Sequence, residues 1–299
     1  IRDRSREALL EQGLYPTWDA EARGRLCLSC HLGGDERFIN HQIMGAGHPR
    51  LSFELDTFNF LQPHHVVDDD YIKRKGQVDF VQDWAIGQAL AALHSINWLL
   101  DEEEGWRGIF LEPALLDCHS CHRRMDADQW QPRRSNRLGP GEMRLNDSNL
   151  LMLQMILVAV DPDGAGRIRE LNGALHQATT QGLDSTLAAA QDLKAELEGM
   201  VVALKSHAFV LDDLRKILAE LGSQSAVGEF TDYVAGEQAA MAIVNIVLAF
   251  ERNGTLEKDS VSDDLDRLFE VVADEYEYSD QQLSMAIQTL KSHLDAKQG

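Results

Sequence analysis

The sequence predicts an all-α protein in which a region of short helices and loops is followed by a helical bundle. Six of the seven prolines lie at or before Pro140 and punctuate the first region into short segments. Beyond Pro162 there is no proline, and apolar residues recur with a helical period. All four cysteines lie in the first region. We therefore expect a boundary near residue 145, with one domain over 1–145 and a bundle over 146–299.

The cysteines form two Cys-x-x-Cys-His motifs. The motifs are Cys27-Leu28-Ser29-Cys30-His31 and Cys118-His119-Ser120-Cys121-His122. This spacing is the attachment signature of c-type haem, in which two thiols bond to neighbouring vinyl groups and the next residue binds the iron. The sequence therefore predicts two covalently bound haem c groups and a haem-dominated first domain. His31 and His122 are the expected iron ligands.

Other uses of the cysteines explain the pattern less well. Two pairs could share one tetrahedral zinc, but structural zinc pairs usually lie within about 15–20 residues of each other, far closer than Cys30 and Cys118. A thioredoxin-like pair needs a βαβ context, and the chain shows almost no strand pattern. Disulfides would not explain the histidine that follows each pair.

The first region is expected to contain several helices. Residues 1–24 are predicted to be helical, and residues 35–44 a short helix that breaks at Gly45-Ala46-Gly47. Pro49 is suited to the first turn of another helix, which Pro63 would end. A longer helix is expected over 78–100. In the second region, breaks at Gly182, 222–228 and Asn253-Gly254 divide the chain into four or more antiparallel helices with acidic outer faces.

The chain is strongly acidic. Its formal net charge is −21, from 49 acidic and 28 basic residues. This charge disfavours nucleic acid or an anionic membrane as a partner and favours a basic redox partner, although it could serve solubility alone. No run of about 20 apolar residues predicts a transmembrane segment. Because haem c is attached outside the cytoplasm, we expect a periplasmic or extracellular protein whose start, Ile1, is processed or truncated.

The sixth ligand of each iron decides the chemistry, because a second strong ligand makes an electron carrier and an open position allows catalysis. His48 is the first candidate, since it follows a Gly-Ala-Gly hinge that lets the backbone approach a porphyrin. His41 is the second candidate and His65 the third. Further candidates are His64, His94, Met44 and Met125. The histidines of the bundle, His176, His207 and His293, are expected at the surface.

A basic patch accompanies the second motif. It comprises Arg123, Arg124, Arg133 and Arg134, in and beside a connector rich in Arg, Pro and Gly over 131–146. Pairing with haem propionates and simple solvation of the loop are equally good interpretations.

Residues 27–71 resemble a bacterial multihaem cytochrome c family. The resemblance rests on Cys-Leu-Ser-Cys-His-Leu-Gly, on 47–58 (Gly-His-Pro-Arg-Leu-Ser-Phe-Glu-Leu-Asp-Thr-Phe) and on Asp117-Cys-His-Ser-Cys-His. These proteins are similar in haem packing to the tetrahaem cytochrome of ammonia oxidisers and to hydroxylamine oxidoreductase. The resemblance implies that histidine ligands come from neighbouring stretches, and that further haems are present if the native chain extends upstream. It implies nothing for residues after about 150.

The leading functional hypothesis is a multihaem cytochrome that carries single electrons between redox proteins or haem subunits. The alternative is an oxidoreductase that acts on a nitrogen or sulfur compound at one open haem, which would need acid–base residues beside the iron. A third role, compatible with the first, is a component of a larger electron-transfer complex with the bundle as its docking module.

Overall fold

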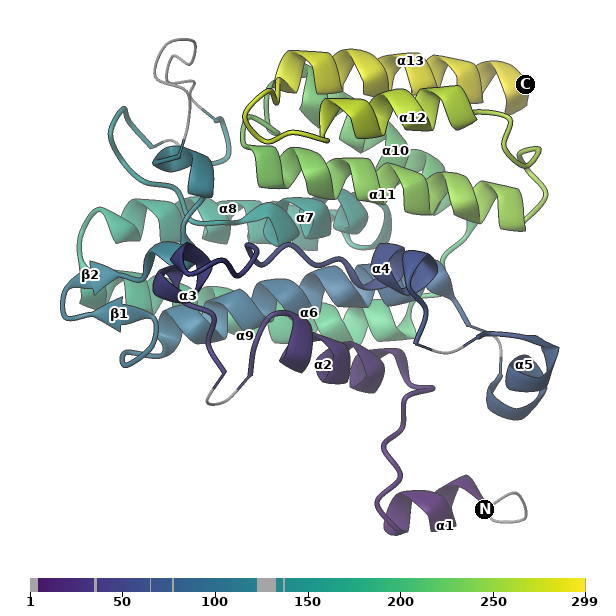
Figure 1. Ribbon diagram of the computed structural model, residues 1–299, viewed down its shortest axis with the longest axis horizontal. Helices are drawn as coiled ribbons and strands as arrows, with labels where there is room; N and C mark the ends of the chain where they lie inside the picture. Colours follow the sequence, from purple (N-terminus) through teal and green to yellow (C-terminus); the bar gives the residue numbers. More distant parts are fainter. Residues whose placement is uncertain are drawn as a thin grey trace.

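The fold is almost entirely helical, as predicted. The computed structural model describes residues 5–34, 37–64, 66–76, 78–122, 133–136 and 138–298. Within these residues there are thirteen α-helices, two short 3₁₀ helices and one two-stranded antiparallel hairpin (Figure 1). The hairpin pairs Trp106 with Leu111 and Arg107 with Phe110.

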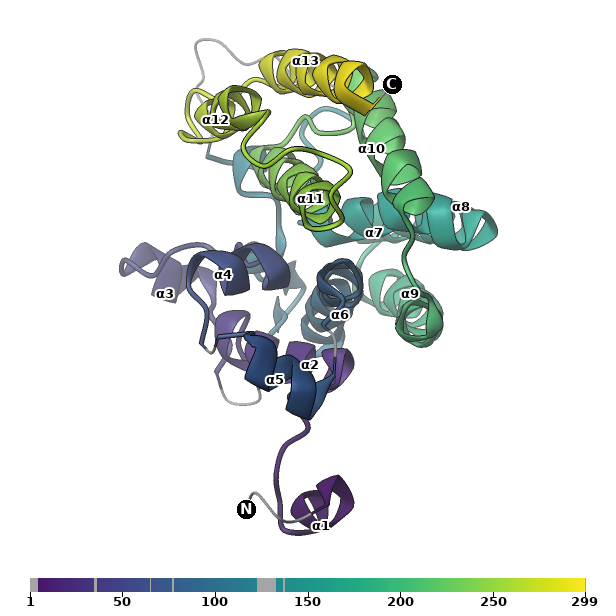
Figure 2. The same ribbon diagram turned by 90° about the vertical axis from the view of Figure 1, so that its right-hand side faces the viewer.

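The first half of the chain contains short helices around one long helix. Its elements are α1 (Arg6–Glu11), α2 (Ala20–His31), α3 (His41–Gly45), α4 (Leu55–Leu61), α5 (Asp69–Lys75), α6 (Phe80–Leu100), β1 (Trp106–Arg107), β2 (Phe110–Leu111), η1 (Pro113–Leu115) and η2 (Cys118–Ser120). Helix α1 hangs away from the body of the molecule in both views (Figures 1 and 2). The expected helix over 78–100 is confirmed by α6, which begins two residues later.

The second half is a set of seven longer helices, as the proline-free pattern predicted. They are α7 (Ser148–Val160), α8 (Pro162–Thr179), α9 (Leu183–Ser206), α10 (Leu211–Ala226), α11 (Tyr233–Arg252), α12 (Ser262–Val271) and α13 (Asp280–Gln298). Figure 2 shows α11 between α12 and α13 on one side and α4 and α6 on the other. Helix α11 therefore joins the two halves of the chain.

Three helix predictions for the first region are wrong in detail. The short helix expected over 35–44 begins, among the described residues, only at His41 and ends at Gly45. Residues 1–24 do not form one helix, because α1 ends at Glu11 and α2 begins after Asp19, whose carboxylate accepts from Ala22 N at 3.0 Å. The segment after Pro49 is not helical until Leu55. It is held extended because Arg50 and Ser52 both bond to Glu237, 187 and 185 residues further along the chain.

One hydrophobic core crosses the expected boundary near residue 145. Its buried apolar side chains run without interruption from Leu28 on α2 to Leu294 on α13. Helix α6 packs against α2 and α4 on one side and α7 and α9 on the other. The division into domains at 145 and 146 stays a prediction, and the packing makes the two halves mutually dependent.

Helix α11 is long and apolar enough to cross a membrane by length and composition alone. The sequence analysis did not single it out. In the structure 89% of its most apolar window is buried, so it serves here as a core helix. Among the residues described, no other helix of at least 18 residues meets this criterion.

A buried ion network lies where the connector meets the bundle. Arg133 Nη1 donates to Asp232 Oδ2 at 2.8 Å, and its Nη2 pairs with Asp147, which also accepts from Asn172 at 2.7 Å. Burial alone would raise the pKa of Asp147, but the Arg133 and His176 side chains hold it below its ordinary value. Neither expected role of Arg133 is therefore borne out, since it is neither solvated nor available to a propionate. Arg134 is exposed, and Arg123 and Arg124 lie outside the described residues.

The expected surface position of His176 is also wrong. Its ring is fully buried, Nδ1 lies 2.9 Å from the Asn172 carbonyl oxygen, and Nε2 is 3.9 Å from Asp147 Oδ2. Burial lowers the pKa of this histidine, which favours the neutral ring. His293 is exposed as expected, and His207 is half-buried.

Candidate haem-attachment sites

The first motif occupies the last turns of α2. Cys27, Cys30 and His31 stand at positions i, i+3 and i+4, so the helix presents all three on one face. The helix is anchored beside this face by Leu28, which is buried, and by Gly24, where an added Cβ would lie 2.8 Å from Leu90 of α6. Burial raises the pKa of the Cys27 thiol, whereas Cys30 is exposed.

A cavity of about 480 Å³ borders this face of α2. Cys30, His31, His48, Phe53 and Phe58 line it, together with the chain between Pro49 and Ser52. Its volume falls in the usual range of ligand pockets, about 300–1,000 Å³, and its walls are mainly apolar. The His31 ring stacks on Phe53 at 4.1 Å between centroids, and this contact orients the imidazole.

Two histidines approach the first motif. The His64 ring lies 6.2 Å from that of His31, with the two planes perpendicular. Burial, and then His64, lower the pKa of His31, which favours the neutral imidazole that a metal needs. His48 borders the cavity, and its Nδ1 lies 2.6 Å from the Pro49 carbonyl oxygen. The structure thus brings His48 and His64 to this site, and His64 had not been ranked among the first candidates.

The second motif occupies η2 and the turn after it. Asp117 caps the short helix by accepting from His119 N at 3.0 Å, and His122 N donates to the Cys118 carbonyl oxygen at 2.7 Å. Asp117 N in turn donates to the Arg144 carbonyl oxygen, which ties the motif to the end of the connector. Burial raises the pKa of the Cys118 thiol, and Cys121 is exposed.

His41 stands opposite His122. The two ring centroids are 6.0 Å apart and the planes differ by 30°. His41 is the first residue of α3. The preceding Asn40 caps this helix, because its Oδ1 accepts a hydrogen bond from Ile43 N at 3.0 Å. Its backbone N–H donates to Glu112 Oε1 at 2.7 Å, and Glu112 is a buried carboxylate at the end of the hairpin. The hairpin therefore positions a histidine that lies 81 residues from its counterpart.

The ring spacings at both motifs fit one iron between each pair. Two imidazoles that bind opposite faces of a metal through nitrogen, with bonds of about 2.0 Å, have ring centroids about 6 Å apart. Aromatic rings that merely touch also have centroids about 4.5–7 Å apart. The spacing is therefore consistent with a shared iron but does not demonstrate one, and the main argument for haem is the Cys-x-x-Cys-His pattern. Each motif thus has two thiols, its own histidine and a second histidine nearby, His64 at the first and His41 at the second, which are the side chains that would hold a covalently attached haem.

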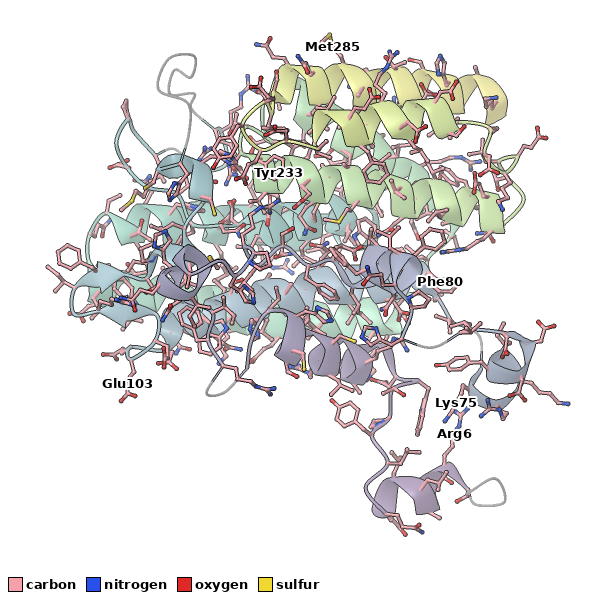
Figure 3. All side chains as sticks on the ribbon, viewed as in Figure 1. Arg6, Lys75, Phe80, Glu103, Tyr233 and Met285 are labelled. Carbon is pink, nitrogen blue, oxygen red and sulfur yellow. The ribbon has the colours of Figure 1, made fainter. Side chains whose placement is uncertain are left out.

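The beginning of α11 contacts both sites. Tyr233, labelled in Figure 3, packs edge to face on His119 of the second motif at 5.6 Å. The Arg50 guanidinium, two residues after His48, lies 4.6 Å above the same Tyr233 ring and donates two hydrogen bonds to Glu237. Sequence reasoning missed Tyr233 and Glu237, because nothing near them in the chain signals a cofactor.

The remaining candidates are placed as follows. His65 and Met125 lie outside the described residues. His94 on α6 receives a hydrogen bond from Trp98 at Nε2, 2.7 Å away, with the Leu32 carbonyl oxygen at 3.0 Å from the same nitrogen. Met44 is half-buried on α3. In the part of the chain that the structure describes, no group of three or more His, Cys, Asp or Glu is arranged to hold a metal ion, so the four cysteines do not gather at one point.

Comparison with known proteins adds no relative, since no family model, no curated protein and no solved structure matches the chain.

Proposed function

We propose that this chain is a periplasmic or extracellular multihaem c-type cytochrome that passes single electrons between redox proteins. The observation that carries the proposal is the pair of Cys-x-x-Cys-His motifs. In each, the ring centroid of a second histidine lies about 6 Å from the ring centroid of the histidine in the motif. Cys27 and Cys30 would hold one haem, and Cys118 and Cys121 the other. When bound, each haem supplies reversible one-electron chemistry at iron, tuned by its axial ligands and burial.

The residues of the chain have separate tasks in this function. His31 and His122 would each hold one iron, and a second ligand would come from His64 or His48 at the first haem and from His41 at the second. Phe53 and Phe58 would supply apolar walls to the first site. Glu112 and Asn40 hold the backbone at the start of α3, which fixes where the His41 side chain begins. A fixed backbone at a ligand would suit electron transfer, because little needs to move when charge changes.

An optical and electron paramagnetic resonance spectrum of both oxidation states tests the proposal. Two low-spin haems are expected if both second histidines bind. A high-spin signal would favour the alternative, an oxidoreductase that acts on a nitrogen or sulfur compound at an open iron. Absence of a c-type absorption spectrum in protein matured with haem would contradict both.

Replacing the second histidines is expected to change one haem at a time. His41→Ala should convert the haem at Cys118 and Cys121 from low-spin to high-spin or mixed, which removes about half of the low-spin signal. At the first motif, His64 and His48 are the two candidates for the second ligand. If His64, whose ring is 6.2 Å from that of His31, is the ligand, His64→Ala should convert more of the low-spin signal than His48→Ala. If His48, which lines the cavity, is the ligand, His48→Ala should have the larger effect.

The matched control for this series is His293→Ala, because His293 is exposed on α13 and should leave both signals intact. If none of the three variants changes spin state, His65 inherits the role of second ligand, and the His41 pairing is wrong.

The acidic surface is expected to steer cationic donors. Asp68, Asp69 and Asp70 at the start of α5 are exposed, as are Glu102, Glu103 and Glu104 before β1 (Figure 3 labels Glu103). Reduction by a small cationic donor should slow as salt rises, since the Debye length falls from about 10 Å at 0.1 M to about 3 Å at 1 M. Stopped-flow traces with a cationic and an anionic donor measure this. If reduction by the cationic donor is no faster at low salt than at high salt, the acidic surface does not steer the donor.

A further inference from the structure

A second cavity lies on the other side of α4 from the His31 cavity. Its volume is about 220 Å³, and it opens towards solvent between α4, α6 and the end of α11. Phe80, labelled in Figure 3, marks its position at the start of α6. Most of its wall is apolar, but four charged side chains face it. They are Arg23, Asp56, Asp83 and Arg252.

Asp56 is the unusual member of this group. Its residue is 3% exposed, and no described residue donates a hydrogen bond to its carboxylate or forms an ion pair with it. Its neighbour Glu54 is fully engaged, since it accepts from Asp56 N, Thr57 N and Asn245. Burial, and then the Glu54 charge, raise the pKa of Asp56 to about 8. A buried carboxyl without a partner is normally protonated or supplied with water.

Asp83 is held differently. It pairs with Arg23, whose other nitrogen donates to the Thr17 carbonyl oxygen at 2.7 Å. Burial raises the pKa of Asp83 to about 6, although the Arg23 charge opposes the change. Arg252 stacks on Phe80 with its guanidinium carbon 4.1 Å from the ring centroid, and no described carboxylate lies within ion-pair distance of it.

The cluster thus holds more acids than bases. The charged groups that act on Asp56 and Asp83 are Asp19 and Arg23 from α2 and its cap, Glu54 from the cap of α4, Asp79 from the cap of α6, and Arg252 from α11. Tyr71 from α5 is a further titratable side chain that lines the cavity. Of the two arginines, Arg23 is already paired with Asp83, and Arg252 is exposed and stacked on Phe80, so neither closely neutralises an additional negative charge placed nearby. A proton bound to one of the carboxylates would balance that charge at the shortest distance.

The cluster reaches the first motif through α2. Arg23 stands one helical turn before Cys27. Burial is the largest cause of the raised pKa of the Cys27 thiol. The Arg23 charge lowers this pKa, and the Asp83 charge raises it. Asp83 and Arg23 also act on Asp56. The same charges therefore face the cysteine that would carry the haem and the unpartnered carboxyl in the cavity.

We infer that Asp83 and Asp56 form a proton-binding site that takes up a proton when the haem at Cys27 and Cys30 gains an electron. The inference rests on the proposed function. The haem would accept one electron from a donor protein, and one proton from solvent in the cavity would bind a carboxylate oxygen of Asp83 or Asp56, so that the local charge would be unchanged. The site would thus make electron uptake dependent on pH and would turn an electron carrier into a carrier of an electron and a proton.

The expected pH range follows from the two acids. An electron nearby raises a carboxyl pKa, so uptake occurs only above the pKa that the group has in the oxidised protein. Asp83 should respond in a lower pH range than Asp56, because the pKa of Asp83 is raised to about 6 and that of Asp56 to about 8. In these ranges the midpoint potential of the first haem should fall as pH rises, by at most about 59 mV per pH unit for one proton per electron.

Potentiometric titration of the haem-loaded protein from pH 5 to 9.5 tests the inference. Asp83→Asn should flatten the lower range, and Asp56→Asn the upper range. Arg252→Gln removes a charge that lowers the pKa of Asp56, so the upper range should begin at a higher pH. Arg252 is exposed, so this variant stays informative if Asp83→Asn fails to fold. The matched control is Asp263→Asn, an exposed first-turn acid of α12.

Infrared difference spectra between the two oxidation states supply a second readout. A carboxylic acid C=O band should appear on reduction and be lost in the variant that flattens the potential. A first-haem potential that does not vary with pH, or slopes that all three cluster variants leave unchanged, would overturn the inference while leaving the cytochrome in place. Absence of any haem redox signal would instead remove the proposed function itself.

Discussion

Denatured protein from cells that attach haem covalently is expected to exceed the 33.5 kDa polypeptide by two haem groups. Each thioether survives denaturation, so intact mass counts attached haems directly. Serine at both Cys27 and Cys30 should leave one haem, and serine at both Cys118 and Cys121 should also leave one. Replacing all four should leave none.

The control for the mass series is Ser29→Ala, which changes a residue inside the first motif without removing a sulfur or the histidine, and should leave two haems. Bound zinc, or a single haem in the unchanged protein, would contradict the assignment. The structure makes shared zinc the poorer alternative, because in the described residues no group of three or more His, Cys, Asp or Glu is placed to hold one metal ion.

Arg133→Met is expected to destabilise the fold by about 3–5 kcal/mol, because it leaves two buried carboxylates without their cation. Asp147 and Asp232 are both nearly fully buried, and Arg133 is the side chain that bridges them. The measurement is urea or thermal unfolding followed by far-ultraviolet circular dichroism.

Two further variants make the Arg133 result interpretable. Arg169→Met removes a half-exposed arginine on α8 whose nearest carboxylate oxygen is 3.9 Å away, and it should cost less than about 1 kcal/mol. Arg133→Lys keeps the charge but cannot bridge both acids in the same geometry, so it should fall between the two. Equal stability of Arg133→Met and Arg169→Met would show that the network contributes nothing.

The long helices could be predicted because their signal is local. The apolar period of α6, and the proline-free pattern of α9 and α11, each lie within one segment. The extended chain after His48 could not be predicted, because its conformation depends on Glu237 and Asn245, which lie more than 180 residues away. The same reason explains Arg133 and His176. Each looks like a solvated polar residue until its buried partners are known.

The candidate sites divide along the same line. The residues expected to attach haem can be predicted from the sequence, because their chemistry requires them within five consecutive positions. The second histidine of each site cannot be predicted in this way, because its position depends on tertiary structure. His41 reaches His122 through the buried Glu112 of a hairpin that no pattern predicted, and His64 reaches His31 from a loop after Pro63.

The contact of α11 with both sites has a consequence for the order of assembly. A chain that emerges from its amino end presents Cys27 and Cys118 long before Tyr233 and Glu237 exist to pack beside them. During that interval Arg50, beside the first site, and His119, within the second motif, lack their contacts with α11. If haem is attached as proposed, the maturation machinery would meet the cysteines before these contacts form. A circular permutation that places α11 first should impair haem attachment more than it impairs folding.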